Sequence, residues 1–253
     1  MYRIECSHFN AKLIAESGQC FRWTHEDERP QEWTVKALGR ELHLYDRGCK
    51  DDGVNVCDDI ELDCTESEFD DIWHDYFDLG TDYTDIDGKA KVFHDRFLED
   101  SLKDCRGMRI LRQDRWETII SFLISQNNNI PRIKKSIEKI CSGSSHFPTP
   151  QEILDMELSD KGLGYRDVYL KSAAQWELDG KSELMEINGV GPKVYACIRL
   201  YGMHDMSYCP IDTWMKKLIA EDYGGVRPAW MDDENAGYYQ QLCFCHKRRM
   251  NKR

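Results

Sequence analysis

Two charged residues stand where helices are expected to begin, and both could take part in catalysis. In "INGVGPKVYAC" (187–197), Lys193 follows a double-glycine turn and precedes an apolar helix. The amino end of a helix is partly positive and disfavours an ammonium group, by at most about 2 kcal/mol. Lowering the pKa of a lysine by about three units from 10.4 requires roughly 4 kcal/mol. Desolvation must supply the larger share, so we expect Lys193 to become a neutral amine when a bound ligand excludes water.

A neutral amine at this position could attack an electrophilic carbon and form a Schiff base. A lysine that only pairs with a phosphate is the alternative, and the spacing alone leaves both open. The preceding turn allows two functions as well. Gly189 and Gly191 permit positive φ and Pro192 suits a first helical turn, so the free amides could bind a phosphate oxygen. A purely structural turn is the alternative.

Asp212 in "CPIDTWMKKLI" (209–219) stands at the expected start of another helix. Aspartate at such a position is most often an N-cap. The cap is compatible with a second role, because a carboxylate fixed by capping bonds stays ionised. It could then stabilise positive charge that develops on an oxocarbenium-like sugar.

The apolar periodicity predicts an α+β fold. The first 50 residues predict β structure, with alternating apolar residues in "EWTVKAL" (32–38) and "RELHLYDRG" (40–48). From about Phe69 the spacing becomes helical, and we expect helices within 69–79, 91–102, 114–126, 131–141, 148–156, 165–178, 181–186, 193–202, 212–222 and 233–246. These patterns predict an N-terminal antiparallel β-sheet subdomain (1–100) packed on a larger all-helical body (101–253) that contains a helix-hairpin-helix motif. Helices around 69–102 would join the two parts, and the basic tail "HKRRMNKR" is expected to fray.

The net charge of −12 is unevenly distributed along the chain. Residues 51–87 hold 15 Asp and Glu and no Lys or Arg, whereas the other 216 residues hold 31 acidic and 34 basic residues. We expect the acidic stretch to form a solvated face. A polyanion could still bind elsewhere on the molecule.

Cysteines and apolar runs exclude several classes of protein. Eleven scattered cysteines without an export signal favour reduced thiols over disulfides. The pair in "CFCH" (243–246) lacks a second ligand pair, so no metal site is expected, and no organic cofactor is implied. No run is long and apolar enough to cross a membrane. We expect a cytoplasmic protein, associated with the nucleoid if the source is prokaryotic.

Several further motifs carry a family resemblance. "SGQCFRW" (17–23), "SQNNNIPRI" (125–133), "GLGYR" (162–166) and "AGYYQQLCF" (236–244) accompany the Gly-Val-Gly turn with Lys193 and the Pro-Ile-Asp of Asp212. In this order they resemble the 8-oxoguanine DNA glycosylase/AP lyase family of the helix-hairpin-helix DNA glycosylase superfamily. The likeness spans nearly the whole chain.

The resemblance implies a base-excision repair enzyme that acts as a monomer on double-stranded DNA with 8-oxoguanine opposite cytosine. A damaged nucleotide would leave the base stack, because C1′ is inaccessible inside a duplex. Lys193 would attack C1′ and expel the base, and the resulting Schiff base would allow β-elimination of the 3′ phosphate. Asp212 would support the cationic sugar.

The same resemblance implies a pocket for the extruded base. The carbonyl of Gly18 would accept the N7 hydrogen that distinguishes 8-oxoguanine from guanine, and Gln240 would read the Watson-Crick edge. Phe244 and Cys197 would sandwich the ring. Pro210 would line the pocket, where Tyr201 replaces a methionine of the family pattern. Without the resemblance, a turn glycine, an exposed amide and ordinary helix core would be the preferred interpretations.

A second set of residues would contact the DNA. Asn127, Arg132, Tyr165 and Arg166 would fill the gap left by the extruded nucleotide and read its partner, with Arg132 predicting a preference for cytosine. The hairpin glycines Gly189 and Gly191 would approach the backbone, and Trp214 stands where the family carries a DNA-contacting histidine. Two alternatives stay open: a monofunctional alkyl-base glycosylase of the same superfamily, and a noncatalytic helix-hairpin-helix DNA-binding protein.

Overall fold

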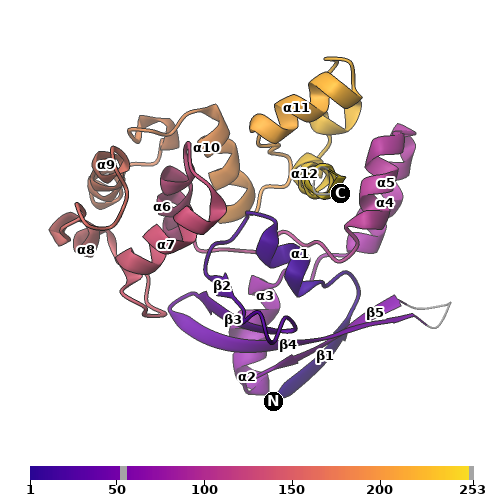
Figure 1. Cartoon of the computed structure of the whole chain (residues 1–253), viewed down its shortest axis with the longest axis horizontal. Coiled ribbons are helices and arrows are strands. Elements are labelled where there is room, and N and C mark those ends of the chain that lie inside the picture. The colour runs from indigo at the N-terminus through magenta and orange to yellow at the C-terminus, as the bar shows by residue number, and fades with distance from the viewer. Residues whose placement is uncertain (52–55, 251–253) are drawn as a thin grey trace.

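A computed structural model of the chain describes residues 1–51 and 56–250, in which an antiparallel sheet packs beneath a helical body (Figure 1). The sheet contains β1 (Tyr2–Cys6), β2 (Trp23–Thr24), β3 (Glu32–Ala37), β4 (Arg40–Asp51) and β5 (Val56–Leu62), in the order β1-β5-β4-β3-β2. The predicted alternation holds, because Trp33 pairs with Leu44 and Val35 with Leu42, and all four side chains are buried. The predicted α+β fold class is confirmed.

Two elements of the sheet region depart from the sequence prediction. Helix α1 (Ala11–Glu16) interrupts the N-terminal region that was predicted to be β structure throughout. It forms because the Asn10 side chain caps its first turn, accepting from the Leu13 N–H at 2.9 Å, and because Ile14 is buried against the sheet. Strand β5 lies within the acidic stretch, where Ile60 and Leu62 alternate as buried residues among the carboxylates.

The helical body follows most of the predicted ranges. Its elements are α2 (Glu66–Glu68), η1 (Phe69–Trp73), α3 (His74–Tyr76), α4 (Tyr83–Ala90), η2 (Lys91–Phe93), α5 (Arg96–Asp104), α6 (Arg115–Ser125), α7 (Ile130–Cys141), α8 (Pro150–Asp155), α9 (Arg166–Leu178), η3 (Leu184–Glu186), α10 (Pro192–Cys197), η4 (Ile198–Gly202), α11 (Thr213–Asp222), η5 (Ala229–Asp232) and α12 (Ala236–Met250). The predicted helix at 193–202 is α10 continued by the π-helical turn η4. The predicted helix at 181–186 is only the short 3-10 turn η3.

The prediction that the basic tail frays is wrong for the residues that the structure describes. Helix α12 continues to Met250, and the Lys247 ammonium is buried against Asp222 Oδ2 at 2.5 Å. This ion pair anchors the last turns of α12 to α11. Residues 251–253 lie outside the described part of the chain.

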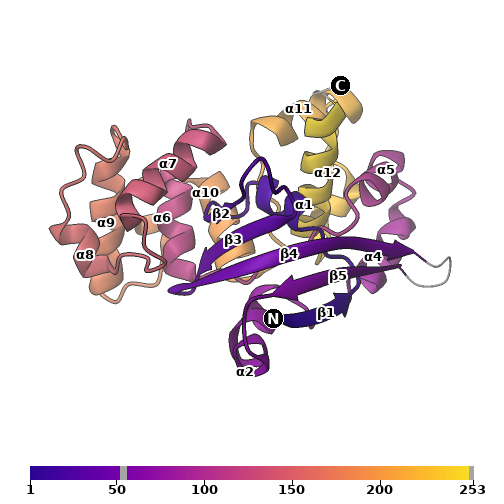
Figure 2. The same cartoon turned by 60° about the horizontal axis from the view of Figure 1, so that its bottom comes forward.

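The two parts have separate apolar cores. One core joins the sheet with α1 and the segment from η1 to α3, and it includes Trp23, Trp33 and Phe77. The other core fills the helical body and includes Tyr83 and Ile86. The chain therefore passes from the first core to the second between Phe77 and Tyr83, within the region 69–102 whose helices were predicted to join the two parts. Figure 2 shows the long strand β4 running beneath α1 and α12. The buried Arg22 guanidinium links the parts, donating to Glu117 Oε2 at 3.2 Å and to the Ser144 carbonyl at 2.6 Å.

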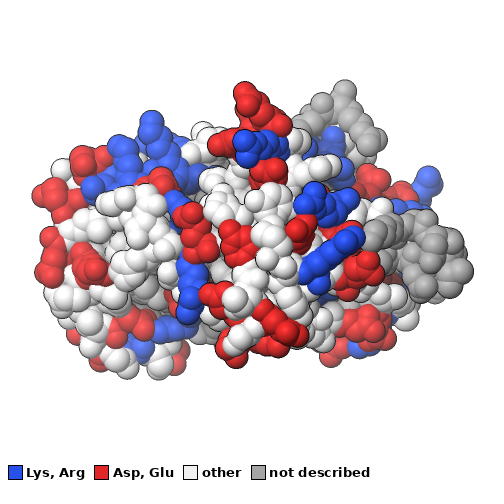
Figure 3. Space-filling model, turned by 90° about the horizontal axis from the view of Figure 1, so that it is seen from below, with Lys and Arg blue, Asp and Glu red and all other residues white. Residues whose placement is uncertain are grey.

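The prediction of a solvated acidic face is wrong for three carboxylates, Asp58, Asp59 and Asp78, which are buried. Asp58 accepts the Phe9 N–H at 2.7 Å, and Asp59 accepts the Arg3 Nε–H at the same distance. Buried charges need such partners, and the chain supplies them from outside the acidic stretch. Figure 3 accordingly shows acidic and basic side chains interspersed on the face seen from below. Residues 52–55 of the stretch lie outside the described residues.

Asp78 is the centre of the largest of these polar clusters. Its carboxylate accepts from Arg112 Nε at 2.8 Å and from the Tyr83 hydroxyl at 2.7 Å, and His204 Nε2 lies 3.2 Å away. Burial raises the pKa of the Asp78 carboxyl, but hydrogen bonds from His204 and Tyr83 outweigh this effect, so the pKa lies below its ordinary value.

None of the helices described is long and apolar enough to span a bilayer. Within the same residues, no group of three or more His, Cys, Asp or Glu side chains is placed to hold a metal ion.

We predict that Asp78→Asn lowers the free energy of unfolding at pH 7 by about 3 kcal/mol, because the substitution takes a buried carboxylate away from the Arg112 guanidinium and the Tyr83 hydroxyl that donate to it. A carboxyl whose pKa is lower in the folded state stabilises the fold above its unfolded pKa, near 3.9, and this stabilisation is lost as the pH falls through the folded pKa. The wild-type protein should therefore lose stability below about pH 4, and the variant should lose less. Urea unfolding at pH 7 and pH 3.5 measures both effects.

Asp75→Asn is the matched control, since the exposed Asp75 Oδ1 lies 3.5 Å from the same Arg112 Nε. Exposed pairs contribute little to stability, so this variant should behave as wild type. Equal losses in the two variants would contradict the role of the buried carboxylate.

Candidate active site

One cavity of about 700 Å³ brings the two predicted catalytic residues together. Lys193 and Asp212 both line it, although they come from the starts of α10 and α11. Of the other predicted site residues, the following also line it: Gly18, Cys197, Tyr201, Pro210, Gln240, Phe244, Asn127, Gly191 and Trp214. Residues as distant in the sequence as Ser17 and Phe244 therefore line the same cavity.

Lys193 is held at the cavity by the start of α10. Gly191 is the N-cap residue of this helix, Pro192 occupies its first turn, and Tyr195 N–H donates to the Gly191 carbonyl at 2.9 Å. The Lys193 ammonium forms no ion pair among the described residues. Its Nζ lies 5.2 Å from the centroid of the Phe122 ring, a favourable cation–π distance. The amine is thus half-buried, faces the cavity and has no carboxylate partner.

Cys197 lies one turn after Lys193 and shares its helix face. Burial raises the pKa of the Cys197 thiol to about 11, although the neighbouring Lys193 ammonium counteracts part of the shift. The side chain therefore remains a neutral thiol at pH 7. It forms a soft, apolar part of the cavity wall rather than a second nucleophile.

Asp212 is the N-cap of α11, as predicted. Its Oδ1 accepts the Met215 N–H at 2.9 Å, and its backbone carbonyl accepts from Lys216 N–H. No hydrogen bond from the described residues occupies Oδ2. The cap fixes the carboxylate in place, while one oxygen is left to face a positive charge in the cavity.

A glycine turn and the helix α12 supply another part of the cavity lining. Gly18 has φ +82° and lies between the buried residues Ser17 and Gln19. Gln240 is 3% exposed, and its Oε1 has no hydrogen-bond partner among the described residues. A buried acceptor without a partner is costly, so this oxygen is suited to a donor on a bound ligand.

Arg248 also lines the cavity and was not predicted. Its guanidinium lies 5.2 Å from the centroid of the Phe244 ring, and Nη1 donates to the Glu16 carbonyl at 3.1 Å. The helical spacing of four from Phe244 could have indicated that the two side chains share a face. That signal was missed because the basic tail was expected to fray.

The residues predicted to read the DNA partner lie outside the cavity or on its rim. Tyr165 is 50% exposed, and Asn127, with φ +46°, places its Nδ2 3.3 Å from the Tyr165 hydroxyl. Arg132 is exposed on the first turn of α7. Arg166 instead is buried, and its guanidinium donates to the Gln126 carbonyl at 2.9 Å. In this arrangement Arg166 holds the loop before α7 rather than facing solvent.

The hairpin before Lys193 requires only one of its two glycines. Gly189 has φ +93°, and a Cβ there would lie 2.6 Å from Cδ2 of Tyr169. Gly191 has φ −102° and open space around it, so the turn uses the positive φ that glycine permits at Gly189 and not at Gly191. The close approach to Tyr169 is what fixes the turn.

Known proteins resemble this chain in sequence and structure. The family model for the N-terminal domain of 8-oxoguanine DNA glycosylase matches residues 1–119. An N-glycosylase/DNA lyase of Saccharomyces cerevisiae is 26% identical over 83% of this chain and 67% of its own length. A protein called MBOgg1, solved with a low-affinity DNA ligand, is 32% identical with a TM-score of 0.86, covering 98% of this chain and 96% of that one. An 8-oxoguanine glycosylase/lyase of Clostridium acetobutylicum, solved with double-stranded DNA containing cytosine opposite 8-oxoguanine, is 29% identical with a TM-score of 0.85, covering 97% and 93%.

We predict that Gly189→Ala lowers the free energy of unfolding by about 2 kcal/mol, because alanine is strained at this φ and its Cβ would overlap the Tyr169 ring. Gly191→Ala is the matched control two residues away, and it should leave stability unchanged or slightly raised. Urea unfolding of both variants measures the difference. Equal destabilisation by the two would show that Tyr169 does not set the turn.

Proposed function

This chain belongs to the 8-oxoguanine DNA glycosylase/lyase family, and we propose that it performs both reactions of that family with one residue, Lys193. One observation supports this proposal most strongly. The Lys193 amine has no ion-pair partner among the described residues, and it shares a cavity with a carboxylate that a helix cap holds in place. Because one chain supplies both groups, we also propose that it acts as a monomer.

In the first reaction the neutral Lys193 amine attacks C1′ of an extruded nucleotide. The new N–C1′ bond forms as the glycosidic bond breaks, and the base leaves with the bonding electron pair and takes up a proton. The sugar ring carries positive charge in this transition state, which the Asp212 carboxylate stabilises. Ring opening then gives a Schiff base between Nζ and C1′.

In the second reaction the Schiff base acts as an electron sink. A proton leaves C2′, the C3′–O bond breaks, and the 3′ phosphate departs with its electron pair. Water then hydrolyses the imine and regenerates the lysine. Entry of the nucleotide into the cavity expels water from Lys193, which favours the neutral amine that the first step needs.

The cavity residues of the glycine turn and of α12 recognise the base. The Gly18 carbonyl accepts the N7 hydrogen of 8-oxoguanine, whereas guanine would present a lone pair to the same oxygen. The unpartnered Gln240 Oε1 accepts an N–H of the Watson-Crick edge. Phe244 and Cys197 enclose the faces of the ring, and Tyr201 and Pro210 complete the pocket.

The DNA duplex lies across the rim of the cavity. Tyr165 wedges into the base stack beside Asn127, while Arg166 keeps the loop that carries Asn127 in place. Arg132 reads the orphaned base and prefers cytosine, and the exposed cations Lys135 and Lys139 on the same helix contact phosphates. Trp214 and the hairpin glycines Gly189 and Gly191 contact the backbone of the damaged strand.

We predict that sodium borohydride traps a covalent complex between this protein and a duplex with 8-oxoguanine opposite cytosine, because it reduces the Schiff base. Lys193→Gln should reduce trapping more than about 100-fold, since Lys193 is the half-buried lysine of the cavity lining, whereas Lys216, which also lines the cavity, is exposed, and the variant should still bind the duplex. Denaturing gel electrophoresis measures trapping, and fluorescence anisotropy measures binding. Undiminished trapping in Lys193→Gln would eliminate this lysine as the nucleophile.

We predict that Arg132→Ala flattens the dependence of excision on the opposite base, with the ratio of cytosine to adenine falling about tenfold, the value of one good base contact. Single-turnover excision from the four duplexes measures the ratios. The control is Lys135→Ala, which removes an exposed cation of the same helix and should weaken binding equally for all four partners. An unchanged ranking and spread in Arg132→Ala would refute the reading role.

A further inference from the structure

We propose that Tyr201 and Gln241 are positioning residues, which hold the Gly18 carbonyl in the orientation that recognises the damaged base. This inference rests on the proposed function of Gly18. It adds Gln241, which had no assigned role, and it gives Tyr201 a role other than lining the pocket.

A chain of two short hydrogen bonds carries the inference. The Tyr201 hydroxyl donates to Gln241 Oε1 at 2.6 Å, and Gln241 Nε2 donates to the Ser17 carbonyl at 2.8 Å. All three residues are buried. The two hydrogen bonds can form in this direction only, because a flipped Gln241 amide would set its oxygen against the Ser17 carbonyl oxygen.

Each of the three residues joined by these hydrogen bonds is adjacent to a part of the proposed pocket. Tyr201 lies in η4, which continues the helix that carries the proposed nucleophile. Gln241 follows Gln240 on α12, and Ser17 precedes Gly18. The hydrogen bonds therefore connect three segments that are separated by up to 224 positions in the sequence, and they set the spacing across the pocket.

The Gly18 carbonyl has no intrinsic preference for the orientation it adopts. Gly18 has φ +82°, in a region that glycine enters without strain, so its neighbours must fix its peptide groups. The Gln19 N–H points to Ser17 Oγ at 3.3 Å, and Gln113 Nε2 donates to the Gln19 carbonyl at 2.8 Å. Because the peptide is planar and trans, the Gly18 carbonyl points away from Ser17 Oγ. The Gln241 bond fixes Ser17 itself, at the other end of the turn.

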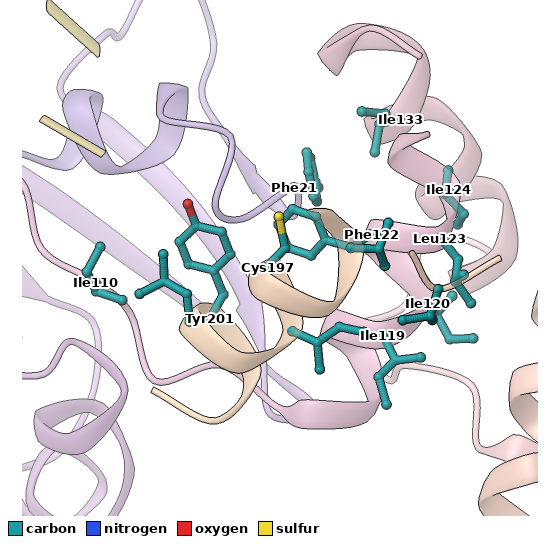
Figure 4. Close-up of a cluster of buried hydrophobic side chains, with 14 of the residues drawn as sticks. Phe21, Ile110, Ile119, Ile120, Phe122, Leu123, Ile124, Ile133, Cys197 and Tyr201 are labelled. Carbon is teal, nitrogen blue, oxygen red and sulfur yellow. The ribbon is translucent and has the colours of Figure 1, made fainter. Parts of the chain in front are cut away.

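The Tyr201 side chain is held rigidly enough to serve as the anchor. Its ring stacks on Phe122 with centroids 5.3 Å apart and an interplanar angle of 14°. Figure 4 shows Tyr201 and Cys197 on neighbouring turns of one ribbon, with Phe122 and Phe21 beside Cys197. Burial raises the pKa of Tyr201 well above its ordinary value, so the hydroxyl keeps the proton that it donates.

The two reactions depend differently on this chain of bonds. Excision of 8-oxoguanine requires the Gly18 carbonyl to meet the N7 hydrogen, so a displaced carbonyl slows it. Cleavage at a preformed abasic site uses the Lys193 amine with no base in the pocket. The ratio of excision to abasic-site cleavage therefore reports on the position of the carbonyl, and a general loss of folded protein lowers both rates together.

The test compares Tyr201→Phe, Gln241→Leu and the double variant. Single-turnover excision is measured on a duplex with 8-oxoguanine opposite cytosine, and strand cleavage on the same duplex with an abasic site. We expect the ratio of the two rates to fall about tenfold in each single variant, the effect of one hydrogen bond lost from the transition state. The ratio in the double variant should fall no further than in the more impaired single variant, because both substitutions break the same chain of hydrogen bonds.

Tyr239→Phe is the matched control. This buried tyrosine of α12 donates to the Ile86 carbonyl at 3.2 Å and does not line the cavity, so its loss should leave the ratio unchanged. If Gln241→Leu fails to fold, Tyr201→Phe decides the matter alone, since it removes a single oxygen atom.

A ratio equal to wild type in Tyr201→Phe would overturn the proposal, and so would effects of the two substitutions that multiply in the double variant. Failure of the underlying function is a separate outcome. It would show in the unmutated protein, as abasic-site cleavage or binding without any release of 8-oxoguanine.

Discussion

The site depends on keeping one ammonium group unpaired beside an aromatic wall. The Lys193 amine lies beside the Phe122 ring and faces the cavity, and the carboxylate of Asp212, which lines the same cavity, uses one oxygen as a helix cap. An ion pair between the two would stabilise the protonated lysine and remove the proposed nucleophile. Capping therefore has a chemical consequence: it keeps the negative charge in the cavity while it holds the carboxylate away from the amine.

The polar groups around the cavity fall into two classes. Some of them satisfy one another, as in the chain of hydrogen bonds from Tyr201 through Gln241 to Ser17 and in the bonds of Arg166 to loop carbonyls. Others, above all Gln240 Oε1, have no hydrogen-bond partner among the residues that the structure describes. A rigid frame of paired groups is what allows the unpaired groups to stay in place until a ligand supplies their partners.

Local rules explain which features the sequence could predict. The helix starts at Lys193 and Asp212 follow from capping and from proline and glycine preferences, which act within a few residues. The buried Asp78 and the role of Gln241 could not be inferred in this way, because Arg112 lies 34 positions from Asp78 and Ser17 lies 224 positions from Gln241. Strand β5 was missed because its carboxylates obscure the alternation of Ile60 and Leu62.

The same long-range pairing reconciles a net charge of −12 with a polyanionic substrate. Carboxylates of the acidic stretch are held by Arg3 and Arg112, so part of their charge is neutralised inside the protein. In Figure 1 two elements of that stretch, β5 and α2, lie at the sheet end, whereas α7 lies in the helical body. Screening limits the reach of exposed charges to about 8–10 Å at physiological salt. The exposed cations of α7 can therefore attract DNA without being cancelled by the carboxylates at the sheet end.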